Sequence, residues 1–107
     1  MNTAWLYLLV AAVFETGWAI GLEFSDGFSN PIPSIATIVS MAISVLLLAK
    51  AVQSLPIGTA YAVWTGIGAT ATAVLGVVLF DESSSVARFG FIGLIILGVV
   101  GLELTSG

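Results

Sequence analysis

One acidic residue, Glu15, lies in a long apolar stretch and is the side chain best placed to do chemistry. From residue 4 to residue 22 no other side chain is charged. A helix of these residues would span about 28 Å at roughly 1.5 Å per residue, the hydrocarbon thickness of a bilayer. Glu15 would lie near mid-membrane, where a carboxylate costs about 2.5–3.5 kcal/mol. We therefore expect Glu15 to bind protons or a cation; a neutral acid bonded to a neighbouring helix is the alternative.

Aromatic side chains recur at helical spacing near this acid. Trp18 follows Glu15 by three residues and would share its helix face. Tyr61, Trp64 and Gly68 fall on one face of another apolar run. A carboxylate beside aromatic rings suits a cation, because the acid supplies charge pairing and the rings supply their quadrupoles. The alternative is that the tryptophans are anchors at the membrane surface, although both lie well inside their runs.

A site of this kind favours ion exchange over a channel. A carboxyl group that binds a proton or a cation, but not both at once, couples the movement of the two. Protonation removes the charge that holds the cation, and the cation in turn favours loss of the proton. Four helices are few to surround a pathway, so we expect a dimer that contributes two Glu15 side chains.

The composition argues against several other function classes. The 107 residues include no His and no Cys, so the common metal sites and the Cys-His or Ser-His catalytic pairs are absent. No glycine-rich loop ends in Lys-Ser or Lys-Thr, as a phosphate-binding loop would. Six acids stand against Lys50 and Arg88, which excludes a polybasic surface for nucleic acid. We therefore expect no enzyme activity, no metal and no cofactor.

Apolar helices must position these residues. The chain is 59% hydrophobic and 7% charged, whereas soluble domains have about 25% charged residues. So short a soluble fold could not hide this much apolar surface. The sequence predicts a single all-α transmembrane domain over residues 1–107, with helices at about 4–22, 33–51, 57–80 and 86–104. The expected location is the plasma membrane, crossed several times.

The last apolar run contains four glycines. Gly90, Gly93 and Gly101 lie near one stripe of the expected helix, and Gly98 is a fourth. Membrane helices use small residues where they pack closely, because lipid gives no hydrophobic drive to associate. The stripe predicts an oligomer interface. Packing within one chain, or the general tolerance of membrane helices for glycine, is the alternative.

The two basic residues are divided equally between the two ends of the expected helices. Lys50 lies on the side of the chain termini, and Arg88 lies on the side of the first and third connections. Membrane orientation follows the excess of Lys and Arg on one side, and here there is none. We expect the chain to insert both ways, which would permit an antiparallel homodimer. A fixed orientation set by another determinant is the alternative.

Three segments carry a resemblance to a known family: residues 14–20 (FETGWAI), 25–28 (SDGF) and above all 55–69 (LPIGTAYAVWTGIGA). They resemble the small multidrug resistance transporters, and within them the guanidinium exporter subgroup. The resemblance covers essentially the whole chain and implies an antiparallel, dual-topology homodimer of four-helix subunits that exchanges a cation for protons.

The resemblance also implies roles for particular residues. Glu15 of both subunits would be the shared proton and substrate site. Gly66 and Gly68 would mark a flexible point in the third helix, and the last helix would form the dimer contact. The implied partners are a small guanidinium-type cation, protons, membrane lipid and a second copy of the chain. The pocket would be lined by Trp18, Ser44, Tyr61 and Trp64.

The sequence departs from the subgroup pattern at several positions. A basic residue is usual where this chain has Glu23 and again where it has Glu103, and these changes should alter surface charge. Ala12, Thr16 and Gly17 are unusual near the acid and are expected to bear on the pocket. Two alternatives stay open: a broader exporter of quaternary ammonium and other drug cations, and a membrane assembly subunit that transports nothing.

Overall fold

Four long helices make up the computed structural model, which describes residues 2–105. Each helix is long and apolar enough to cross a membrane. This confirms the prediction of an all-α chain with four possible spans. The helices are α1 (Thr3–Ser25), α2 (Pro31–Ala51), α3 (Ile57–Phe80) and α4 (Val86–Thr105).

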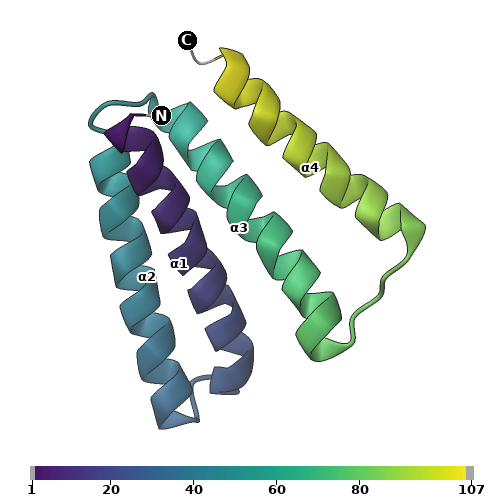
Figure 1. Cartoon of the computed structure of the whole chain (residues 1–107). Coiled ribbons are helices and arrows are strands. Elements are labelled where there is room, and N and C mark those ends of the chain that lie inside the picture. The colour runs from purple at the N-terminus through teal and green to yellow at the C-terminus, as the bar shows by residue number, and fades with distance from the viewer. Residues whose placement is uncertain (1, 106–107) are drawn as a thin grey trace.

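The central helix is α1, which packs against both α2 and α3, whereas α4 contacts α3 alone among the described helices. Figure 1 shows α4 diverging from α3 toward the connection at residues 81–85. The start of α1, the end of α4 and the connection between α2 and α3 lie at the opposite end of the molecule. Lys50, in the last turn of α2, and Arg88, in the first turn of α4, therefore lie at opposite ends, as expected.

Local signals set the helix ends, which lie within three residues of the predicted bounds. Asn2 caps α1 by accepting a hydrogen bond from the Trp5 N–H at 3.0 Å. Helix α1 continues beyond residue 22 to Ser25, and ends where Asp26 adopts the left-handed conformation. Helix α2 begins at Pro31 rather than at residue 33, because proline is tolerated in the first turn of a helix. Helix α4 ends at residue 105 rather than 104.

Arg88 holds the connection between α3 and α4. Ser85 caps α4, and its hydroxyl accepts a hydrogen bond from the Arg88 N–H at 3.1 Å. The Arg88 guanidinium donates to the Ala73 carbonyl of α3 at 3.0 Å and pairs with Glu82 at 2.9 Å. These contacts join the end of α3 to the start of α4 and fix the position of the Glu82 carboxylate.

Small residues let α1, α2 and α3 approach closely. Gly21 of α1 lies against Thr37 of α2, where an added methyl group would overlap the Thr37 hydroxyl. Such contacts are typical of membrane helices, whose association depends on close packing. The buried core is formed by Leu8, Ala11, Ala12, Ala51, Ala60, Val63 and Trp64.

Candidate functional site

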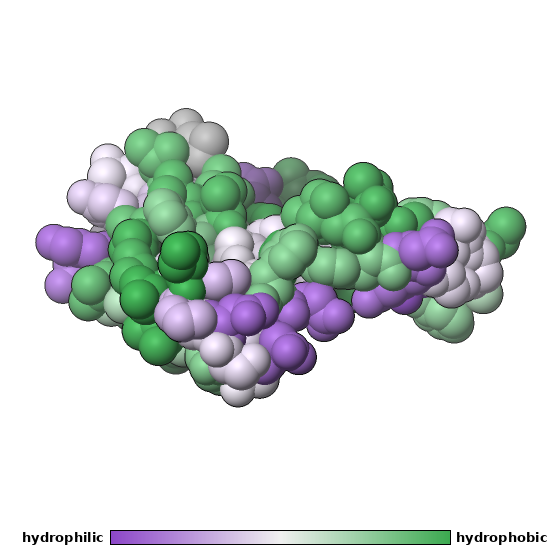
Figure 2. All heavy atoms as spheres, turned by 90° about the horizontal axis from the view of Figure 1, so that it is seen from below, coloured by the Kyte–Doolittle hydropathy of each residue, from purple (hydrophilic) through white to green (hydrophobic). Residues whose placement is uncertain are grey.

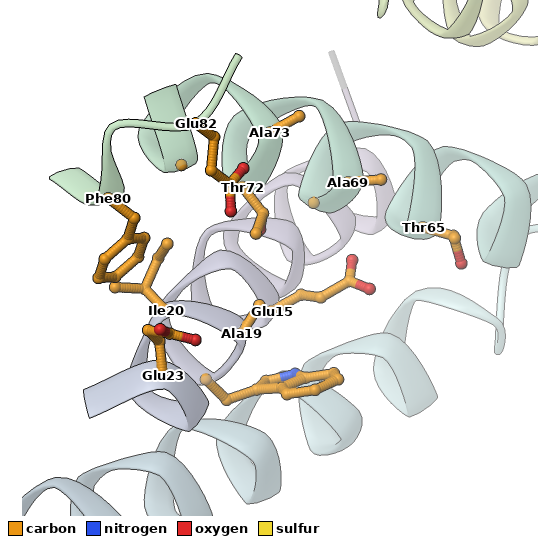
Figure 3. Close-up of a pocket in the computed structure, with 13 residues that line it drawn as sticks. Glu15, Ala19, Ile20, Glu23, Thr65, Ala69, Thr72, Ala73, Phe80 and Glu82 are labelled. Carbon is orange, nitrogen blue, oxygen red and sulfur yellow. The ribbon is translucent and has the colours of Figure 1, made fainter. Parts of the chain in front are cut away.

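A groove of about 460 Å³ between α1 and α3 holds the Glu15 side chain (Figure 3). Helix α3 lines the groove from Thr65 to Phe80 with residues that recur every three or four positions, singly or as adjacent pairs, which is the pattern of one helix face. Helix α1 contributes the face that runs from Glu15 to Glu23. The groove therefore extends from the middle of the two helices to the end that carries the connection at residues 81–85.

The Glu15 carboxyl group lies directly against the backbone of α3 at Gly68. A methyl group added at Gly68 would overlap this carboxyl group and lie 2.9 Å from the Glu15 Cγ. One carboxyl oxygen, Oε1, is buried and has no hydrogen-bond partner. A buried polar atom without a partner costs roughly 1–3 kcal/mol, so a proton or a ligand that pairs with it is favoured.

Trp18 lies in the same groove, and its indole Nε1 is likewise buried without a partner. Among residues 2–105, those that line the groove include three acids, Glu15, Glu23 and Glu82, and no Lys or Arg. Figure 2 views the end of the molecule where the groove emerges, and hydrophilic side chains gather across that end between hydrophobic flanks. Arg88 pairs with Glu82, so the charge of the groove comes from Glu15 and Glu23, and it suits a cation and not an anion.

Ser44, Tyr61 and Trp64, which were predicted to line the pocket, lie outside the lining of this groove. The Trp64 indole donates to the Ser44 hydroxyl at 2.9 Å, and that hydroxyl donates to the Ala11 carbonyl at 2.6 Å. The Tyr61 side chain is 55% exposed, and its ring centroid is 5.5 Å from that of Trp64. The hydrogen bonds join α1, α2 and α3 in the core, and a role of the three residues in binding substrate stays a prediction.

Three residues near Glu15 that depart from the subgroup pattern pack away from the groove. Ala12 is buried in the core, and Thr16 donates its hydroxyl to the Ala12 carbonyl at 3.0 Å. Gly17 faces α2, and none of the three residues lines the groove. An effect of these three residues on the substrate pocket stays a prediction. Glu23 is exposed, as a change of surface charge requires, and it also lines the outer end of the groove.

The glycines of α3 and α4 have different surroundings. Helix α3 is continuous through Gly66, where an added methyl would lie 2.6 Å from a methyl group of Val99 in α4. A flexible point at Gly66 and Gly68 stays a prediction. Apart from its chain neighbours and the backbone of its own helix, no atom of the described chain would lie within 4 Å of a methyl added at any glycine of α4, so packing within one chain does not explain them. These glycines are Gly90, Gly93, Gly98 and Gly101.

Sequence reasoning missed Thr72 and Glu82. Thr72 lines the groove one helical turn beyond Gly68, and its hydroxyl oxygen is buried without a partner. The Glu82 carboxylate lies against Gly76. The spacing of residues 68, 72 and 76 puts them on one helix face and could have identified Thr72. The place of Glu82 depends on the fold of the connection, which spacing within a helix does not give.

Gly68→Ala is expected to slow transport roughly tenfold without lowering stability, because a catalytic or binding group displaced by about 1 Å commonly costs that much or more. The added methyl would push the flexible Glu15 side chain aside. Alanine is favoured over glycine in a helix by about 1 kcal/mol, which offsets the displacement in the folded state. Transport in proteoliposomes and the unfolding temperature in detergent measure the two effects.

Gly58→Ala is the matched control, since a methyl at Gly58 in the same helix meets no atom within 4 Å beyond its chain neighbours and the backbone of its own helix. It should leave transport unchanged. Transport by the Gly68→Ala variant at the wild-type rate would show that transport does not depend on the position of the Glu15 carboxyl group against α3.

Comparison with known proteins identifies the family. The chain matches the family model described as Small Multidrug Resistance protein over residues 3–95. It is 59% identical over 103 residues to a protein named "Guanidinium exporter" from Yersinia pseudotuberculosis, covering 96% of this chain and 99% of that one. Proteins of the same name from Salmonella typhimurium and Escherichia coli K12 are 50% and 48% identical, each over 96% of this chain and 98% of the relative.

These matches and the four apolar helices indicate the same location for the protein. The chain is a multi-pass membrane protein, which in bacteria places it in the plasma membrane. The relatives match this chain over nearly their whole length, and they are named as exporters and not as enzymes. The chain belongs to the small multidrug resistance family of membrane transporters.

Proposed function

We propose that this chain is a proton-coupled antiporter that exports small guanidinium-type cations. The family and the names of the relatives support export of a small cation. The observation that carries the proposal is the Glu15 carboxyl group, which lies midway along α1 in an acidic groove with a buried, unpartnered oxygen. An ionisable group at such a depth is costly to insert, so its presence there favours a functional role.

Glu15 is the shared site for protons and substrate in this proposal. The ionised carboxylate pairs with the cation, and protonation removes the charge and releases it. The two ligands therefore exclude each other. If the site is reached from alternate sides of the membrane, the cation moves one way and protons move the other.

A second copy of the chain in the opposite orientation completes the proposed transporter. The α4 glycines support this unit, because they present small residues that nothing in the described chain covers. The placement of Lys50 and Arg88 at opposite ends also supports it, since the charge count favours neither orientation. Such a dimer brings two Glu15 side chains to the transport pathway.

Guanidinium fits the chemistry of the groove better than other small cations do. It is planar and offers N–H donors in a fork that matches a carboxylate. The Glu15 carboxyl group supplies the acceptor, and the Trp18 ring in the same groove supplies a face for the cation. A quaternary ammonium ion has no N–H to donate and would leave the carboxylate unpaired.

Export of larger apolar cations is the second candidate function. The groove volume of about 460 Å³ lies in the range of pockets for drug-sized ligands. The two candidates differ in what they require. Guanidinium binding requires paired hydrogen bonds, whereas a drug cation requires apolar area.

A competition series distinguishes the two candidates. Purified chain in proteoliposomes is given labelled guanidinium with unlabelled guanidinium, methylguanidinium or tetrapropylammonium. We expect the first two to compete and tetrapropylammonium to be weaker by at least roughly 100-fold, because a site built around hydrogen bonds rejects a ligand without donors. Labelled tetrapropylammonium is tested in parallel, and its uptake by a chain that takes up no guanidinium would assign the chain to drug cations.

A further inference from the structure

We propose that the Thr72 hydroxyl is a hydrogen-bonding contact for the transported cation, placed between Glu15 and the outer end of the groove, and that it favours cations that carry N–H groups. This inference rests on the proposed function. It concerns a residue that neither the spacing of the aromatic residues nor the resemblance to the family singles out.

Three residues of α3 at four-residue spacing, Gly68, Thr72 and Gly76, line the groove. The Glu15 carboxyl group lies against Gly68, and the Glu82 carboxylate lies against Gly76. Four residues of an α-helix rise about 6 Å, so Thr72 lies one turn from each of these contacts. Figure 3 shows Thr72 between Glu15 and Glu82. A cation that leaves Glu15 along the groove toward this end must pass Thr72.

The Thr72 hydroxyl differs from several other hydroxyls in the described helices. Thr16, Ser34 and Thr37 each donate to the carbonyl four residues earlier, at 3.0, 2.6 and 2.8 Å. Thr72 makes no such bond, although its Oγ1 is buried. A buried polar atom without a partner is uncommon and requires an explanation. A ligand of the groove would supply the missing partner.

Three buried atoms without partners line this one groove: Glu15 Oε1, Trp18 Nε1 and Thr72 Oγ1. Carboxylate and hydroxyl oxygens accept hydrogen bonds, whereas the indole N–H only donates. The Glu15 and Thr72 oxygens are therefore the two of these atoms that can accept hydrogen bonds from the N–H groups of a guanidinium ion. A cation without N–H groups gains nothing from Thr72, so the hydroxyl contributes to selectivity.

Thr70 provides a matched control in the same helix. Its hydroxyl oxygen is also buried and without a partner, but it lies on the opposite side of α3. There it lines an apolar groove toward α4 with Ile96, Val99 and Val100. Replacement of either threonine by valine removes the same hydroxyl and keeps the same shape. Only the change at Thr72 alters the groove that contains Glu15.

The test measures KM and kcat for guanidinium exchange in proteoliposomes of the full-length chain. Thr72→Val should raise KM roughly threefold to tenfold, the usual effect of one lost hydrogen bond, with kcat changed less than about twofold. Thr72→Ser, which retains the hydroxyl, should restore the wild-type KM. Thr70→Val should leave KM unchanged. If the Thr72→Val chain is not recovered as a folded protein, Thr72→Ala replaces it with the same expectation.

An unchanged KM in the Thr72→Val chain would overturn the inference while leaving the proposed function intact. An equal rise of KM in the Thr70→Val chain would also overturn it, because the effect would then come from packing of α3. Failure of the wild-type chain to transport guanidinium would overturn the proposed function and this inference together.

Discussion

Glu15→Gln is expected to abolish proton-coupled guanidinium exchange while the chain still folds. Glutamine has nearly the same shape, but it can neither release a proton nor pair its charge with a cation. Loss of one partner of a buried ion pair costs about 3–5 kcal/mol, so transport should fall by at least roughly 100-fold. Uptake of labelled guanidinium into proteoliposomes, driven by a pH gradient with the interior acidic, measures the loss. Size-exclusion chromatography in detergent checks the fold.

Asp81→Asn is the control for the Glu15 variant. It removes one acid from an exposed position outside the groove, and asparagine tolerates the left-handed conformation that Asp81 adopts. Transport by this variant should match the wild type. Guanidinium accumulation by the Glu15→Gln chain at more than a small fraction of the wild-type rate would refute the proposed site.

Fixing the membrane orientation of the chain is expected to remove most of its activity. Ser83→Lys and Ser84→Lys in the connection between α3 and α4 change the count of basic residues from one against one to three against one. Such a bias commits the chain to one orientation. An antiparallel dimer requires both orientations. The guanidinium resistance of cells that express this variant alone should therefore fall by roughly tenfold or more.

The opposite bias provides the control for orientation. Gln53→Lys and Ser54→Lys add two charges to the exposed connection between α2 and α3, at the other end of the molecule. This variant should also be inactive alone, and coexpression of the two should restore resistance. Full activity of either variant alone would argue for a parallel dimer or a monomer.

The four spans could be predicted because apolar runs of this length are the strongest signal in a membrane sequence. The helix ends could not be predicted as well, because hydropathy marks where a chain leaves the hydrocarbon and not where its helix stops. Helix α1 passes the charged Glu23 and ends only where Asp26 and Gly27 adopt φ values of 50° and 68°. That backbone conformation follows from the turn residues.

The groove could be predicted only in part. Glu15 and Trp18 are close in sequence, so helical spacing alone places them together. The hydrogen bond between Trp64 and Ser44 joins residues of two helices, and it depends on how α3 is rotated against α2. The α4 glycines show the same limit. Their stripe was visible in the sequence, but only the structure shows that residues 2–105 of the chain do not cover them.

The central claim is that one site, Glu15, exchanges a cation for protons, and the flux of protons driven by guanidinium tests it most directly. Wild-type chain is sealed in vesicles with a pH-sensitive dye, at equal pH on both sides, and guanidinium is added outside. The account predicts that protons leave as guanidinium enters, so the vesicle interior becomes alkaline, and that Glu15→Gln vesicles show no change. Guanidinium entry without any movement of protons would contradict it.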